Sequence, residues 1–153
     1  MPFSATIALA VSLAFTGGSS QIQSTPNAVV SVMPQSQSVQ QYIDGYFADE
    51  PIMAAIASCE SHFEQFGPDG QVLKNGHSSA VGVFQIMSSV HASFADEKLG
   101  LDIDSLQGNA AYAQYLYQKE GTKPWDASKG CWSKSAAYKD MQADASAVSI
   151  NAN

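Results

Sequence analysis

The chain has 153 residues, a length that fits one domain of ordinary size with additional end segments. Hydrophobic residues make up 45% of it and charged residues 14%, so the chain can form a core and is not disordered throughout. It has no arginine, and its net charge is -7. This charge argues against nucleic acids and anionic membranes as partners, because binding to them depends on cationic side chains that release counterions.

The first 38 residues divide into an apolar segment and a polar one. Residues 7–15 are mostly apolar and are followed by a run of small residues, which is typical of a secretory signal although no positive charge precedes it. Nine residues are too few to span a bilayer. We expect residues 1–20 to be a signal peptide of a secreted or periplasmic protein without stable membrane insertion, the alternative being a buried or frayed helix. Residues 21–38, rich in Ser and Gln, indicate a linker.

The folded domain is expected over residues 39–132. Apolar residues recur with helical spacing from Val39 to Phe47, and an acidic pair before Pro51 indicates the start of a second helix that runs to about Phe63. Turn residues at 67–70 and 74–76 predict a small hairpin or an irregular loop.

The second half of this domain is also predicted to be helical. A compact apolar stretch, residues 80–87, leads into a helix over about 88–99 that Gly100 closes. Asp102 or Asp104 caps a longer helix, which ends at Gly121. Residues 133–153 have little to bury and predict a mobile tail. The fold class is therefore mainly α with a small hairpin or loop region.

Glu60 is the first candidate for chemistry. On a helical wheel it lies on the flank of the apolar face that Ile56 and Cys59 help to form. Partial desolvation there would raise the pKa of its carboxyl group and keep it protonated near neutral pH, as a general acid requires. The alternative is an ordinary surface glutamate whose carboxylate reaches water.

Four ordered sequence blocks carry a family resemblance. They are Cys-Glu-Ser-His-Phe at 59–63, Ser-Ala-Val-Gly-Val-Phe-Gln-Ile at 79–86, Leu-Gln-Gly-Asn-Ala-Ala-Tyr-Ala-Gln-Tyr-Leu at 106–116, and Pro-Trp-Asp-Ala-Ser-Lys-Gly-Cys-Trp at 124–132. Together they resemble the lytic transglycosylases of the soluble lytic murein type, in the lysozyme-like superfamily, and most closely its small secreted branch. The resemblance implies a lysozyme-like α+β domain.

The resemblance also implies roles for individual residues. Glu60 would be the catalytic acid and base, Gly82, Val83 and Gln85 would form a floor that meets sugar N-acetyl groups, and exposed aromatic faces would stack on pyranose rings. The substrate-binding residues expected in this way are Ser61, Ser79, Gly82, Val83, Phe84, Gln85, Tyr115 and Trp125.

The expected activity is cleavage of the β-1,4 bond between N-acetylmuramic acid and N-acetylglucosamine in peptidoglycan glycan strands, by a monomer without a cofactor. No second Asp or Glu lies in residues 61–63, 79–87 and 112–117, which line the presumed cleft, and this favours a 1,6-anhydro product formed with help from the substrate's own N-acetyl group. Two alternatives stay open: a hydrolytic lysozyme that uses Asp69, Asp126 or a held water, and a non-catalytic module that binds glycan. A structural protein with coincidental motifs ranks below both.

Two further residue types bear on the site. Cys59 and Cys131 are the only cysteines, and they are either one bridge or two free thiols. If the domain is exported, we expect a disulfide that ties the Glu60 helix to the end of the domain. The histidines, His62, His77 and His91, lack a paired metal-binding spacing, so no metal is expected.

Overall fold

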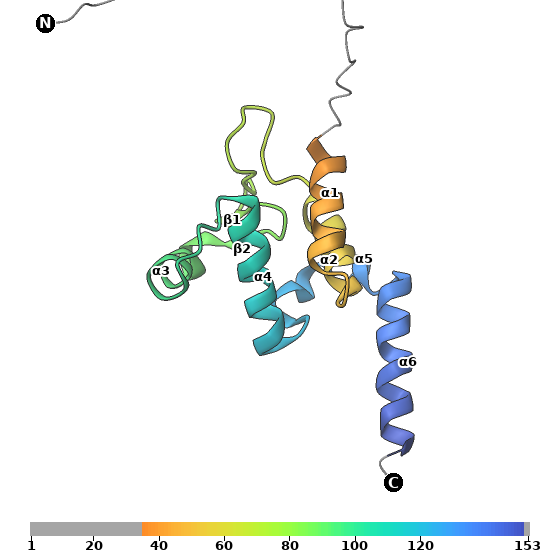
Figure 1. Ribbon diagram of the computed structural model, residues 1–153. Helices are drawn as coiled ribbons and strands as arrows, with labels where there is room; N and C mark the ends of the chain where they lie inside the picture. Colours follow the sequence, from red (N-terminus) through yellow and green to blue (C-terminus); the bar gives the residue numbers. More distant parts are fainter. Residues whose placement is uncertain (1–34, 152–153) are drawn as a thin grey trace, which may run out of the picture. The chain divides into compact units, whose positions relative to one another are not determined.

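The structure of the chain is a computed structural model that describes residues 35–151. The expected signal peptide, residues 1–20, and most of the expected linker lie outside these residues. The described part is mainly helical (Figure 1), and its elements in chain order are α1 Gln35–Tyr46, α2 Pro51–Ser61, β1 Ala80–Val81, β2 Ile86–Met87, α3 Ser88–Leu99, α4 Leu106–Glu120, the 3-10 helix η1 Lys123–Ser128, α5 Lys129–Trp132 and α6 Ala136–Asn151. None of the helices among these residues combines the length and apolar character needed to cross a bilayer.

The predicted helix boundaries are close to those observed. Pro51 occupies the first turn of α2, and Gly100, with φ 64°, ends α3 in the left-handed conformation that favours glycine. The N-cap of α4 differs from the prediction. Ser105 occupies it and accepts a hydrogen bond from the backbone N–H of Gly108, whereas Asp102 accepts one from the N–H of Asp104 in the preceding turn.

The C-terminal segment corrects a prediction. Residues 133–153 were expected to be a mobile tail, but α6 spans most of them and packs against α2. Its Tyr138 ring meets Trp132 edge-on, with 5.4 Å between the ring centroids, and Met141 packs against the core. This helix shows only a weak apolar stripe, so its contacts with α2 and with the core position it.

Aromatic rings form the centre of the core, which lies between the helices. Phe84 is fully buried and lies 5.4 Å from Phe47 at the end of α1 and 6.0 Å from Trp125 in η1, measured between ring centroids. Ile52 and Ile56 of α2 are buried in the same cluster. Burial of such a side chain contributes about 1.5–3 kcal/mol, so this cluster is a main source of stability.

The small sheet lies one segment later than predicted. β1 and β2 pair antiparallel, with Ala80 opposite Met87 and Val81 opposite Ile86, and residues 82–85 join them. We call residues 82–85 the central turn. Residues 67–76, predicted to be a small hairpin or an irregular loop, are a loop with isolated bridges from Phe66 to Val72 and from Lys74 to Val81.

Two buried amide side chains hold the central turn. Gln65 accepts from the N–H of Val83 and donates to the carbonyl of Asp104. Asn109 of α4 accepts from the N–H of Phe84 and donates to the carbonyls of Val81 and Ile103. Both amides are fully buried. They join the turn to α4 and to the loop before it, and loss of either amide would leave buried backbone groups unpaired.

Gly82 must be glycine for two reasons. Its φ is +71°, and a Cβ atom there would overlap the side chain of Asn109 and lie 2.8 Å from Nε2 of Gln65. Gly70 provides a matched comparison, because its φ is +76° but a Cβ atom there would meet nothing within 4 Å.

We predict that Gly82→Ala destabilises the chain far more than Gly70→Ala. The left-handed backbone costs an alanine about 1–2 kcal/mol at either site, and the clash at Gly82 adds roughly 1–3 kcal/mol. Urea unfolding with the disulfide intact measures both. Equal losses would contradict the argument that the two amides occupy the space beside Gly82.

Candidate functional site

Glu60 lies in the last turn of α2, immediately before an abrupt change of backbone direction. The helix ends at Ser61, and the next two residues, His62 and Phe63, have φ values of 55° and 62°. Among the described residues, the one other non-glycine residue with positive φ is Gln85 in the central turn. Such conformations cost on the order of 1–3 kcal/mol each and cluster at functional sites. Here two of them lie directly after the helix that carries Glu60, and the third lies in the central turn, which packs against that helix.

The carboxylate of Glu60 is half-buried and has one close polar partner. The hydroxyl of Ser128, at the end of η1, donates to Oε1 of Glu60 over 2.6 Å. Burial raises the pKa of Glu60 above its ordinary value of 4.5, and the Ser128 hydrogen bond opposes this. The direction predicted from the helical wheel is confirmed, and the carboxyl group keeps its proton to higher pH than a surface glutamate.

A disulfide fixes the two elements that carry Glu60 and Ser128. Cys59 and Cys131 are bonded, with their Cα atoms 6.0 Å apart, which confirms the expected pairing. Cys59 precedes Glu60 in α2, and Cys131 lies in α5, directly after η1. The covalent bond therefore holds the last turn of α2 against the segment that supplies Ser128.

Ser61 joins the Glu60 helix to the central turn from the other side. Its hydroxyl is buried and donates to the carbonyl of Val83 over 2.8 Å, and it lies 3.2 Å from the carbonyl of Ala57. It also accepts from the N–H of Glu64. Ser61 was expected to face a cleft and bind sugar. In the structure it supports the helix that carries Glu60, since its hydrogen-bonding capacity is taken up inside the fold.

The backbone of the central turn is likewise occupied by internal partners. The N–H of Gly82 donates to the carbonyl of Leu73, and the N–H of Gln85 donates to the carbonyl of Gly82. Between them, the N–H groups of Val83 and Phe84 donate to the two buried amides. The side chain of Gln85 donates to the carbonyl of Gly82 within the same turn. Glycine does permit a close approach here, as predicted, but the groups that approach are Asn109 and Gln65.

Two aromatic residues expected to stack on sugar rings are part of the core. Phe84 is fully buried, and Trp125 is 4% exposed with its indole N–H donating to the carbonyl of Phe84. Neither presents a face to the surface. The sequence could not show this, because an aromatic residue in a loop is equally compatible with a core position and an exposed one.

The contacts of Ser79 and Tyr115 are with residues of α3 and α4. The Ser79 carbonyl accepts from the N–H and the hydroxyl of Ser88, and its hydroxyl lies 2.6 Å from that of Ser89, so Ser79 fixes the start of α3. Tyr115 of α4 is half-buried between Phe94 and Tyr112, at centroid distances of 5.7 and 5.6 Å.

His91 extends the same aromatic row. Its Nδ1 lies 3.0 Å from the hydroxyl of Tyr112, and burial lowers the pKa of its imidazole, with the charge of Glu120 opposing this. Among the described residues, no group of three His, Cys, Asp or Glu side chains is arranged to hold a metal ion.

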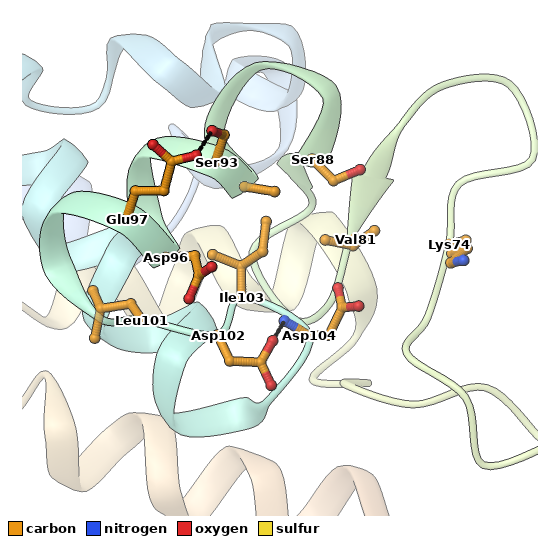
Figure 2. A pocket seen from close by; sticks show the side chains of 11 residues that line it. Lys74, Val81, Ser88, Ser93, Asp96, Glu97, Leu101, Asp102, Ile103 and Asp104 are labelled. Atoms are coloured by element: carbon orange, nitrogen blue, oxygen red, sulfur yellow. Dashed lines mark hydrogen bonds between the residues drawn. The ribbon is translucent and has the colours of Figure 1, made fainter.

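A cavity of about 560 Å³ lies beside α3, away from the residues that contact Glu60. Figure 2 shows carboxylates gathered on one side of it, around Leu101 and Ile103, while Lys74 stands across from them on the loop. Two of the polar groups are paired locally, Ser93 with Glu97 and Asp102 with the N–H of Asp104. Glu60 does not line this cavity.

Sequence reasoning missed three polar residues of the site. Ser128 appeared in the last sequence block without a role, although the expected bond between Cys59 and Cys131 already placed its segment near Glu60, 68 positions away. Gln65 and Asn109 lie in segments that were predicted to be polar or helical, and nothing in those predictions singled out their amides. The one available sign was that Gln65 lies two residues after the first block of the resemblance and Asn109 lies within the third.

Comparisons of the chain with family models, with curated proteins and with solved structures find no match.

We predict that Glu60→Gln stabilises the chain at neutral pH but not in acid. The pKa of Glu60 is higher in the folded chain than in the unfolded chain, so the folded chain binds more protons between the two values and its stability falls as the pH rises through them. Glutamine removes this loss. Urea unfolding should show a gain at about pH 7 that disappears at about pH 3.5.

Glu64→Gln is the matched control, because Glu64 lies four residues on and is exposed. It should change the free energy of unfolding by less than about 0.5 kcal/mol at either pH. A Glu60→Gln variant that is equally stable to the wild type at both pH values would contradict the partial burial of the carboxylate.

We also predict a large loss of stability when the disulfide is removed. The bond closes a loop with a sequence separation of 72, for which the chain-entropy model gives roughly 4 kcal/mol as an upper figure. The double variant Cys59→Ser, Cys131→Ser should show this loss in urea unfolding. Intact mass of the wild type with two free thiols would contradict the bond itself.

Proposed function

We propose that the protein is a peptidoglycan-cleaving glycosidase, a lytic transglycosylase of lysozyme-like fold, with Glu60 as its catalytic acid and base. The observation that carries the proposal is the half-buried Glu60 carboxylate, which has a raised pKa and a single hydrogen bond, from Ser128. The proposed bond is the β-1,4 linkage between N-acetylmuramic acid and N-acetylglucosamine.

The convergence of the four sequence blocks supports this proposal. Ser61 from the first block bonds to Val83 of the second, Asn109 from the third bonds to Phe84, and Trp125 from the fourth donates to the carbonyl of Phe84. Residues far apart in sequence therefore meet at the central turn, next to the helix that carries Glu60. Blocks that resemble one family by coincidence have no reason to meet.

The environment of Glu60 suits a general acid that later becomes a base. A carboxyl group whose pKa is raised by burial stays protonated to higher pH and can protonate the leaving glycosidic oxygen. The resulting carboxylate can then take a proton from the nucleophile. The pKa of Glu60 responds to burial and to Ser128, and the nearby acids Glu64 and Asp126 are exposed.

The absence of a second buried carboxylate near Glu60 in the described residues favours a substrate-assisted reaction. A retaining glycosidase needs a second carboxyl group about 5 Å from the acid. In the proposed reaction the N-acetyl oxygen of the muramic acid stabilises the anomeric cation. The 6-hydroxyl of the same sugar then attacks the anomeric carbon and gives its proton to Glu60, which closes a 1,6-anhydro ring.

Secretion belongs to the same proposal. Disulfides persist in oxidising compartments and are rare in the cytosol of mesophiles. The bond between Cys59 and Cys131, together with the apolar segment at 7–15, supports a secreted or periplasmic location.

We predict that Glu60→Gln abolishes cleavage of purified peptidoglycan, with a loss of at least about 100-fold, while retaining the fold. Glu64→Gln should keep near wild-type activity, because its side chain is exposed. Turbidity clearing and mass spectrometry of the released fragments measure both variants.

The products decide between the alternatives. Fragments whose muramic acid end lacks the mass of one water support the anhydro reaction, whereas reducing ends would show a hydrolytic lysozyme. A wild-type protein that binds glycan but releases no fragments would contradict the catalytic proposal and identify a binding module.

A further inference from the structure

We propose that Ser128 is a positioning residue that hydrogen-bonds Glu60 in both of its protonation states by reversing the direction of its hydroxyl group. This inference rests on the proposed function, since it concerns how Glu60 serves first as acid and then as base. Ser128 itself touches no reacting atom in the proposal.

The geometry of the Ser128 hydroxyl supports this proposal. Its Oγ lies 2.6 Å from Oε1 of Glu60 and 3.2 Å from the backbone carbonyl of Trp125. A hydroxyl group has one proton and two lone pairs, so it can donate to only one of these two oxygens at a time. The carbonyl of Trp125 is therefore an alternative acceptor for the Ser128 proton.

Each protonation state of Glu60 then has a complete set of hydrogen bonds. When Glu60 is ionised, the Ser128 hydroxyl donates to Oε1. When Glu60 is protonated and no substrate is bound, its own O–H donates to Oγ of Ser128, and the Ser128 proton turns to the carbonyl of Trp125; the glycosidic oxygen then replaces Oγ as the acceptor of the Glu60 proton. Only the direction of two hydrogen bonds changes, and no covalent bond of Ser128 forms or breaks.

The acceptor carbonyl is rigidly held. The indole N–H of Trp132 also donates to the Trp125 carbonyl, over 2.9 Å, and a carbonyl has lone pairs for two donors. The Trp125 ring is buried and bonded to the carbonyl of Phe84. The disulfide at Cys131 fixes the next helix. Ser128 can therefore turn its proton without movement of the heavy atoms around it.

Charged groups elsewhere do not substitute for this hydroxyl. The elements packed against α2 are α1, η1, α5 and α6, and their charged residues are all exposed. These residues are Asp44 of α1, Lys123 and Asp126 of η1, Lys129 of α5, and Lys139, Asp140 and Asp144 of α6. Glu64, which follows α2, is exposed, and Glu50, which precedes it, is half-buried at the opposite end of the helix.

The first test measures the pKa of Glu60 without substrate, by carbon NMR of the carboxyl groups in the intact, oxidised protein, with Glu60→Gln identifying the signal. Ser128→Ala should raise this pKa further, because the bond that favours the ionised form is lost. Ser128→Thr should return it toward the wild-type value. Ser58→Ala, which changes a serine of α2 that has no role in the site, should leave the pKa of Glu60 unchanged.

The second test asks whether the bond also exists when Glu60 is protonated. Ser128→Ala should lower the free energy of unfolding both above and below the titration of Glu60, with the larger loss above it, since charged acceptors bond more strongly. A loss confined to the higher pH would overturn the two-state role. An unchanged pKa in Ser128→Ala would overturn the contact itself.

The third test uses peptidoglycan turnover. Ser128→Ala should lower kcat by about 10–100-fold and move the alkaline limb of the pH profile upward, with recovery in Ser128→Thr. A uniform loss with an unmoved profile would indicate a purely structural residue and overturn the inference. If the wild type releases no fragments, the proposed function fails, while the NMR titration still decides whether Ser128 bonds to Glu60 as described.

Discussion

The hydrogen bonds of two buried amides determine the arrangement of this fold. Gln65 and Asn109 hold the central turn to α4 and to the loop before it, and the backbone N–H groups of Val83 and Phe84 that they accept from are buried. A buried backbone group without a partner costs about 1–3 kcal/mol, so the turn has few alternatives to this conformation. Because Ser61 bonds to the same turn, the amides also determine where the last turn of α2 lies.

This arrangement separates supporting residues from reactive ones. The polar groups of the central turn form hydrogen bonds within the fold, so architecture explains the sequence block at residues 79–86. At the end of α2, by contrast, Glu60 has a single partner that approaches from a distant segment. A half-buried carboxylate with one neutral donor is costly to keep charged. Stability does not require this cost, because an apolar residue at the same position would avoid it.

Local chemistry made part of the structure predictable. Pro51, Gly100 and Gly121 mark helix ends because their backbone preferences act within a few residues, and the helical wheel predicted the partial burial of Glu60 from its neighbours on one face. The exposure of Phe84 depends on three elements that meet only in the folded chain, so local sequence could not predict it. The same holds for Ser128 and for α6, whose positions follow from contacts with the distant helix α2.

The long separation between the partners of the site has a consequence for synthesis. Glu60 precedes Ser128 by 68 positions, and the disulfide partners are 72 apart. A growing chain therefore completes α2 well before it contains the groups that orient the carboxylate, and shortened chains that end before η1 lack them altogether. Contacts of this range form late, because the loop between them must first be ordered. The arrangement around Glu60 is thus acquired only after the ribosome has released almost the entire domain.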